Sequence, residues 1–195
     1  MKKILVRCWK TSNPLYIKYH DEEWGVPVYG DRKLFEFLVL ESFQAGLTWE
    51  LILNRRDSFR VAFDNFEPKI VATYSDEEVN RLLGNAKIIR NKLKIRSSIN
   101  NACRVLEIQK EFGSFSDFIW SFVGGKTIYN KFKDLTYLPS QTKESVEMSK
   151  EMKRRGFKFV GPTICYAFMQ AVGLVNDHVL DCFRYKQIIE DAIRQ

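Results

Sequence analysis

The segment RRGFKFVGPTICYAFMQAVGLVNDH, residues 154–178, carries the pattern on which the prediction of the fold rests. Its central part, GPTICYAFMQAVG (161–173), is apolar and ends on glycine, a pattern that predicts a helix with a glycine stop. The preceding stretch TKESVEMSKEMKRRG (142–156) also ends on glycine. Two successive helices are therefore expected here.

Further helices are predicted where apolar residues recur at three- and four-residue spacing behind a capping residue or proline. They are a helix capped by Asp31, a short one from Pro68 to Val71, one opened by the capping box of Ser75 and Glu78 and ended at Gly84, one over 86–113 and one over 114–125. Alternating strand patterns and solenoid repeats are not seen. The sequence predicts an all-α fold and a single domain over residues 1–195.

Hydrophobic residues make up 45% of the chain and charged residues 28%, as in globular proteins. The N-terminal apolar run of three residues is interrupted by Arg7 and is too short for a secretory signal. The longest apolar tract, ICYAFMQAVGLV (164–175), contains Gln170 and is too short to cross a bilayer. A cytoplasmic protein without membrane contact is expected.

The net charge of +7 suggests a polyanionic partner. From position 81 to 104 the chain has seven basic residues and no acidic one, and KEMKRRGFK (150–158) forms a second basic cluster. In a helix-hairpin-helix element centred on Gly84, backbone N–H groups would hold a DNA phosphate, and the side chains of Lys87, Arg90 and Lys92 would add attraction. The alternative is an ordinary helical corner with solvated basic faces.

Glu41 occupies the core position that follows Leu34, Phe37 and Leu38, so the helical spacing directs its carboxylate to the apolar side. An unpaired buried charge is costly, which indicates either a partner such as arginine or a functional site. Aromatic residues stand nearby in QAGLTW (44–49) and LYIKYH (15–20). A carboxylate among aromatic faces suits a flat cationic ring such as an alkylated purine.

The chain has only two histidines, and each stands near a cysteine: His20 follows Cys8, and His178 precedes Cys182 by four positions. In a reducing compartment these cysteines are expected to be thiols or metal ligands rather than disulfides. The other two cysteines, at positions 103 and 165, lie within apolar helical patterns and are expected in the core.

Three of these stretches, NPLYIKYHDEEWGVP (13–27), LFEFLVLESFQAGLTW (34–49) and residues 154–178, together with the closing His-x3-Cys, resemble the bacterial 3-methyladenine-DNA glycosylase I family. The resemblance runs from Cys8 to Cys182 and implies a helix-hairpin-helix glycosylase domain. It also implies one Zn²⁺ per chain that ties residues 8–20 to residues 178–182, with Cys8, His20, His178 and Cys182 as ligands. Two thiolates and two imidazoles complete a tetrahedral shell, so the zinc is expected to be structural; a zinc hydrolase would keep one position open.

The resemblance implies hydrolysis of the bond between deoxyribose and 3-methyladenine in alkylated double-stranded DNA. The flipped base would enter the aromatic pocket, where Glu41 and Tyr19 hydrogen-bond its edge and Trp49 stacks on its face. Tyr16 and Trp9 are assigned to the same pocket. Trp9 departs from the family pattern because it follows Cys8 directly, whereas the family commonly has its aromatic residue two positions after that cysteine.

The turn that contains Gln44, Gly46 and Leu47 is expected to fill the gap left by the flipped nucleotide, with Leu47 either as an apolar wedge or as a core residue. No lysine has a strong claim to form a Schiff base, so a monofunctional, monomeric enzyme is expected. The alternative is a noncatalytic helical DNA-binding protein stapled by zinc.

Overall fold

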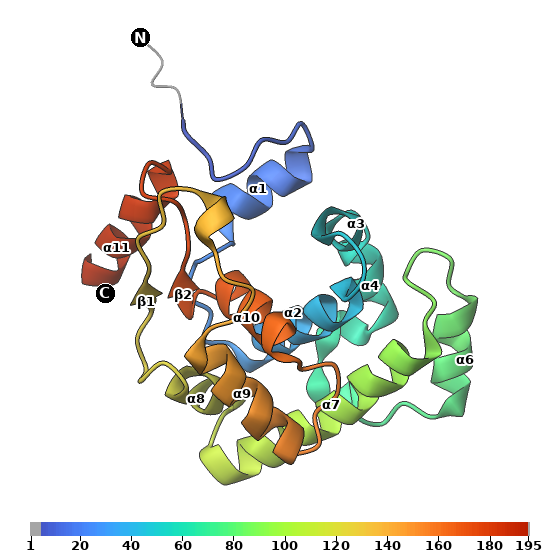
Figure 1. The fold of residues 1–195 in the computed structure, drawn as a ribbon. Coiled ribbons are helices and arrows are strands. Elements are labelled where there is room, and N and C mark those ends of the chain that lie inside the picture. The colour runs from blue at the N-terminus through green and yellow to red at the C-terminus, as the bar shows by residue number, and fades with distance from the viewer. Residues whose placement is uncertain (1–4, 195) are drawn as a thin grey trace.

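A computed structural model describes residues 5–194 of the chain as a mainly helical fold (Figure 1). The helices are α1 (Pro14–Glu22), α2 (Asp31–Gln44), α3 (Trp49–Leu53), α4 (Arg56–Ala62), α5 (Pro68–Val71), α6 (Asp76–Gly84), α7 (Lys92–Phe112), α8 (Phe115–Ser121), α9 (Lys143–Arg154), α10 (Pro162–Ala171) and α11 (Phe183–Arg194). Two 3₁₀ turns, η1 (Asp64–Phe66) and η2 (Leu135–Tyr137), and two short strands, β1 (Ile128–Tyr129) and β2 (Val175–Asn176), complete it. The strands pair in parallel, with Ile128 opposite Val175. The all-α prediction is confirmed, and this short pair is the exception to it.

Helix α2 lies at the centre of the fold, and every residue from 34 to 43 is buried. It packs against α3, α7, α8 and α10, which surround it in Figure 1. Asp31 is the first residue of this helix, but Gly30 is its N-cap. The Asp31 carboxylate instead accepts hydrogen bonds from the backbone N–H groups of Phe115 and Ser116, at 2.9 and 2.8 Å. The predicted cap therefore serves the first turn of α8, because α2 and α8 pack together.

The helix predicted over 86–113 is wrong at its beginning. Residues 85–91 form a loop, and α7 begins at Lys92 behind Asn91, whose side chain accepts a hydrogen bond from the backbone N–H of Lys94. Ile88 extends the apolar period of the sequence, but it does so as a loop residue: its side chain is buried in the core, with 2% exposed, and anchors the loop there. The predicted capping box at the start of α6 is present. The helix predicted over 114–125 ends at Ser121, before the turn that contains Gly124 and Gly125.

Segments near the two ends of the chain lie together. The backbone N–H of Phe183 donates to the carbonyl of Val6 at 3.1 Å, so the residues before α1 meet the start of α11. At the end of α10, Gly173 has a φ of +75°, and a Cβ atom there would lie 2.4 Å from the backbone nitrogen of Pro27. This close approach brings residues 25–28 against α10. The N-terminal apolar run considered as a signal begins among residues 1–4, which lie outside the described residues.

Between residues 5 and 194, none of the helices combines the length and apolar character needed to cross a bilayer.

Candidate functional site

A cavity of about 200 Å³ opens between α1, α2, α3 and α10. Its lining consists of Trp9, Tyr16, Tyr19, Trp24, Glu41, Gln44, Trp49, Ala167 and Gln170. Six of these residues are site residues predicted from the sequence. Trp24, Ala167 and Gln170 were not predicted, although a glutamine inside the apolar tract 164–175 was a usable signal.

Glu41 is the acidic residue of this cavity, and its side chain is buried, with 4% of the residue exposed. Burial raises the pKa of its carboxyl group to about 8, because no nearby cation compensates for the lost water. Within residues 5–194, Glu41 forms no ion pair. The alternative that Glu41 pairs with an arginine is therefore wrong: the buried arginine of this region, Arg56, bonds to Glu23 and Glu36 instead.

Aromatic side chains form most of the wall around Glu41. The rings of Tyr19 and Trp49 lie 5.2 Å apart between centroids, and Trp9 lies 5.1 Å from Tyr16 and 5.0 Å from Trp24. The indole N–H groups of Trp9 and Trp49 are buried and have no hydrogen-bond partner among the described residues. Buried donors normally find a partner, so these two groups indicate a site that a polar ligand completes. Despite its shifted position, Trp9 reaches the cavity.

The turn after α2 closes one side of the cavity. Gln44 lines the cavity and its side-chain N–H donates to the carbonyl of Leu47 at 3.1 Å, while Gly46 supplies a φ of +78°. Leu47 is 36% exposed and does not belong to the core. The buried Lys94 ammonium holds this turn, since it donates to the carbonyls of Phe43 and Ala45 at 2.7 and 2.6 Å.

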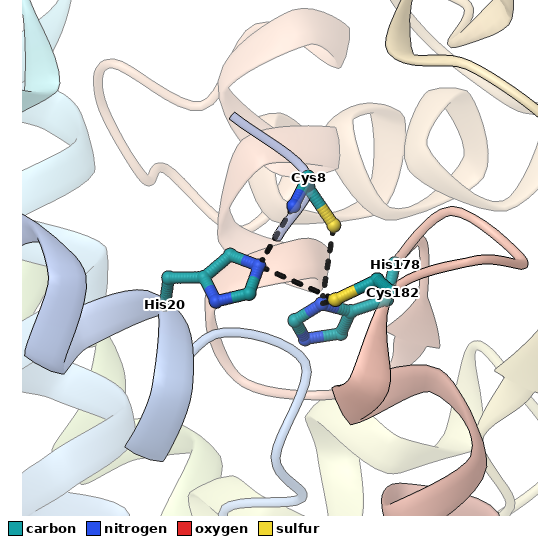
Figure 2. Close-up of side chains that lie close together, drawn as sticks. All are labelled: Cys8, His20, His178 and Cys182. Carbon is teal, nitrogen blue, oxygen red and sulfur yellow. Dashed lines mark hydrogen bonds between the residues drawn. The ribbon is translucent and has the colours of Figure 1, made fainter. Parts of the chain in front are cut away.

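A second group of side chains lies beside the cavity and could hold a metal ion. The ligand atoms of Cys8, His20, His178 and Cys182 all lie within 4.8 Å of one another (Figure 2). The Cys8 sulfur lies 3.3 Å from Nδ1 of His178, and the Cys182 sulfur lies 3.5 Å from Nε2 of His20. A tetrahedral zinc shell would separate sulfur and nitrogen ligands by about 3.5 Å. The donor set and its spacing therefore fit zinc.

The remaining ring nitrogens of both histidines are hydrogen-bonded, which orients each ring toward the cluster. Nδ1 of His20 lies 2.8 Å from Oδ1 of Asp21, and Nε2 of His178 lies 2.8 Å from the carbonyl oxygen of Trp24. Metal-bound histidines commonly have such outer partners. Hydrogen bonds from Cys8 and from the two histidines lower the pKa of the Cys182 thiol, which favours the thiolate that binds metal.

The residues predicted to bind DNA lie in two places. Gln44, Gly46 and Leu47 belong to the turn beside the cavity. Gly84 ends α6, Lys92 begins α7, and Lys87 and Arg90 lie in the loop between these helices; all four are exposed. This loop reaches toward α3 and α4 in Figure 1, where Arg55 donates to the carbonyl of Ala86 at 3.0 Å. None of these four residues lines the cavity.

The connection between α9 and α10 offers a further basic hairpin, built from the second basic cluster of the sequence. Gly161 is the N-cap of α10 and has no side chain, so the first backbone N–H groups of α10 receive no capping hydrogen bond from it. Lys153 and Lys158 are exposed next to it.

Comparison with known proteins gives the relationships of the chain. The methyladenine glycosylase family matches residues 9–185. DNA-3-methyladenine glycosylase 1 of Escherichia coli (strain K12) is 48% identical over 180 residues, which are 92% of this chain and 96% of that protein. The DNA-3-methyladenine glycosylase of Haemophilus influenzae is 45% identical over 177 residues, which are 90% of this chain and 96% of that protein.

Solved structures agree with these relationships. A crystal structure of a 3-methyladenine DNA glycosylase I superposes with a TM-score of 0.89 at 49% identity, and covers 91% of this chain and 98% of its own. The enzyme from Staphylococcus aureus, solved to explain how it recognises 3-methyladenine, superposes with a TM-score of 0.87 at 36% identity, and covers 89% of this chain and 92% of its own. The matched region contains the cavity and three of the four residues of the metal cluster. The chain belongs to the methyladenine glycosylase family.

Proposed function

We propose that this protein is a monofunctional DNA glycosylase, folded as one domain, that flips 3-methyladenine out of alkylated double-stranded DNA and hydrolyses its bond to deoxyribose. The observation that carries the proposal is an unpaired, buried carboxyl group, Glu41, in an aromatic cavity of about 200 Å³. Pockets for drug-sized ligands have volumes of about 300 Å³ or more. The smaller volume of this cavity suits a single base. The curated relatives named above carry the name of this activity.

Selection is the main task of such a cavity, because methylation at N3 gives the base a positive charge and weakens its glycosidic bond. The oxygen of a water molecule bonds to C1′ of the sugar and loses one proton to solvent, and the base leaves with the electron pair of the broken bond, which neutralises its charge. A cation next to Glu41 favours the carboxylate form and lowers the pKa of this group from its raised value. Neutral adenine lacks this attraction. Tyr19 would hydrogen-bond the base and Trp49 would stack on it.

The other assignments follow from the positions of the residues. Leu47 is exposed on the turn beside the cavity, which suits an apolar wedge. Cys8, His20, His178 and Cys182 would hold one structural Zn²⁺, since four protein ligands leave no position for a reactive water. Lys94 is occupied by two carbonyl groups and does not line the cavity, which agrees with an enzyme that forms no Schiff base.

DNA binding is assigned to both basic hairpins. Exposed lysine and arginine side chains of the loop between α6 and α7 would attract phosphates, and the uncapped start of α10 would add backbone N–H donors. We propose that the protein acts as a monomer in the cytoplasm.

The test is to incubate the protein with methylated duplex DNA and to identify the released bases by chromatography. The expected product is free 3-methyladenine, without strand cleavage on a denaturing gel and without release from unmethylated DNA. Glu41→Gln should abolish most of the release while the variant stays folded. A protein that binds the duplex with the expected salt dependence but releases no base would be the noncatalytic DNA-binding alternative, and would contradict the proposal.

A further inference from the structure

A buried carboxylate behind the cavity accepts hydrogen bonds from three side chains. Asp177, which follows β2, is 1% exposed. Its Oδ1 accepts from the side-chain amide of Asn130 at 2.6 Å, and its Oδ2 accepts from the hydroxyl of Tyr166 at 2.5 Å and from Nε2 of Gln170 at 2.8 Å. Asn130 follows β1, whereas Tyr166 and Gln170 belong to α10. Three donors on one carboxylate fix its position firmly.

This carboxylate also decides which end of the Gln170 amide faces which way. Asp177 accepts in all three of its hydrogen bonds, and its partner on Gln170 is the nitrogen Nε2, so the NH₂ group of Gln170 faces Asp177 and the amide oxygen faces away. The backbone of Gln170 is held as well, because its carbonyl accepts from the N–H of Gly25 at 2.9 Å. The amide oxygen Oε1 has no protein donor within residues 5–194 and is not enclosed. Gln170 lines the same cavity as Glu41.

We propose that Gln170 is a specificity-determining residue, whose amide oxygen is held by Asp177 as a fixed hydrogen-bond acceptor for the exocyclic amino group of the bound base. This inference rests on the proposed function. At position 6 an adenine presents an NH₂ donor, whereas a guanine presents an oxygen acceptor. A fixed acceptor in the cavity therefore favours 3-methyladenine over 3-methylguanine. A glutamine free to rotate would accept either base, so the bond to Asp177 is as important as the amide itself.

The proposal assigns different tasks to the two polar groups of the cavity. Glu41 would distinguish a cationic base from a neutral one, since it responds to charge. Gln170 would distinguish an amino group from a carbonyl at the same position of the ring, since it responds to hydrogen-bond polarity. Removal of each group should therefore alter a different preference of the protein.

The experiment is a titration of the full-length, metal-loaded protein with free 3-methyladenine and free 3-methylguanine. It is followed by NMR, which also detects millimolar binding. Gln170→Met keeps the size of the side chain and removes the acceptor. Affinity for 3-methyladenine should fall about tenfold, affinity for 3-methylguanine should stay or rise, and the preference between the two bases should shrink. Gln187→Met makes the same change at an exposed residue of α11 that does not line the cavity, and should leave the preference unchanged.

Asp177→Asn is the second variant, because it keeps Gln170 but offers an amide that lets the glutamine turn. It should shrink the preference in the same direction, and it decides the question if Gln170→Met does not fold. Thermal midpoint and metal content are measured for each variant. Equal losses for both bases, or an unchanged affinity for 3-methyladenine in a folded Gln170→Met, would overturn the proposal while the proposed function stands. A wild-type protein that binds and releases no 3-methyladenine would overturn both.

Discussion

Nε2 of His178 lies 2.8 Å from the carbonyl oxygen of Trp24, and the indole of Trp24 lies 4.6 Å from the same imidazole while it lines the cavity. The Cys/His cluster and the cavity thus share a wall. Trp9, next to Cys8, and Tyr19, next to His20, line the cavity in the same manner. The cluster that joins the two ends of the chain therefore also positions the aromatic residues of the pocket.

Loss of one of the four proposed metal ligands should lower both metal content and stability. Cys182→Ser removes a thiolate from the four-residue cluster. A loss of about 3 kcal/mol in the free energy of unfolding would lower the thermal midpoint by about 9 °C in a chain of this length. Calorimetry and metal analysis measure the two effects. Because Trp9 and Trp24 touch the histidines of the cluster, tryptophan fluorescence should change as well.

Cys103→Ser is the matched control for that variant. Cys103 is a half-buried cysteine of α7 whose sulfur lies 3.7 Å from the carbonyl of Ala72, far along the chain from the cluster. Its replacement should leave metal content unchanged. Equal metal content in both variants would mean that the cluster does not bind metal through Cys182.

Glu41→Gln should change the dependence of stability on pH. Burial raises the pKa of Glu41 from 4.5 to about 8, so the folded protein holds a proton between these pH values that the unfolded chain has released. The free energy of unfolding is therefore highest below pH 4.5, falls as the pH rises from 4.5 to 8, and has lost this contribution once the pH has passed 8. Glutamine cannot ionise, so the stability of the variant relative to the wild type should increase from pH 5 to pH 9. Urea denaturation across this range measures the difference.

Glu36→Gln should give the opposite trend. Glu36 forms ion pairs with Arg56, Lys33 and Arg60, and these cations outweigh its burial and lower the pKa of its carboxyl group. Its ion pairs stabilise the fold above the unfolded pKa and lose this effect as the pH falls through the lower folded pKa. The variant should be destabilised at pH 7, and the difference from the wild type should shrink in acid. Parallel curves for the two glutamate variants would contradict the assigned pKa shifts.

The sequence predicted those parts of the fold in which local pattern and tertiary packing agree. Helices α9 and α10 and the capping box of α6 follow from apolar spacing and end signals. The pattern failed between Gly84 and Lys92, because Ile88 keeps the apolar period while the backbone forms a loop. Periodicity records which side chains are buried, and a loop anchored by one buried residue looks the same as a helix.

The cavity was predictable where a residue violated the local pattern. Glu41 stood out as a carboxylate among core positions. Trp24 did not stand out as a site residue, and Gln170 stood out only as a polar residue in an apolar tract, because the roles of both depend on contacts with distant segments. The ring of Trp24 lies beside His178, and Gln170 is oriented by Asp177. A sequence gives no distance between such segments before the fold is known.

Gly173→Ala should destabilise the fold. The φ of +75° at this position costs about 1–3 kcal/mol for a residue with a side chain, and the new Cβ atom would lie 2.4 Å from backbone atoms of Val26 and Pro27. The combined loss should be about 3 kcal/mol, or about 9 °C in the thermal midpoint. Gly30→Ala is the control, because no atom lies within 4 Å of a Cβ built there. Equal midpoints for the two variants would contradict the close approach.

Charge removal in the loop between α6 and α7 should weaken DNA binding without a change in base binding. Lys87, Arg90 and Lys92 are exposed and do not line the cavity. Each lost phosphate contact reduces the steepness of the plot of log affinity against log salt by about 0.9. The slope of the triple alanine variant should therefore be shallower than that of the wild type by up to about 2.7. Affinity for free 3-methyladenine should stay at the wild-type value. Fluorescence anisotropy with a labelled duplex at several salt concentrations measures the slope.

Two further variants distinguish the contribution of each hairpin to DNA binding from that of the total charge of the protein. Lys153→Ala with Lys158→Ala tests the connection between α9 and α10, where the uncapped start of α10 adds backbone donors that side-chain removal leaves in place. This pair should lower the slope by less than the triple variant. Lys110→Ala with Lys186→Ala removes exposed charge from the far end of α7 and from α11, and should leave the slope unchanged. If that last pair lowers the slope as much as the triple variant, then the duplex responds to net charge alone, and neither hairpin is a defined phosphate site.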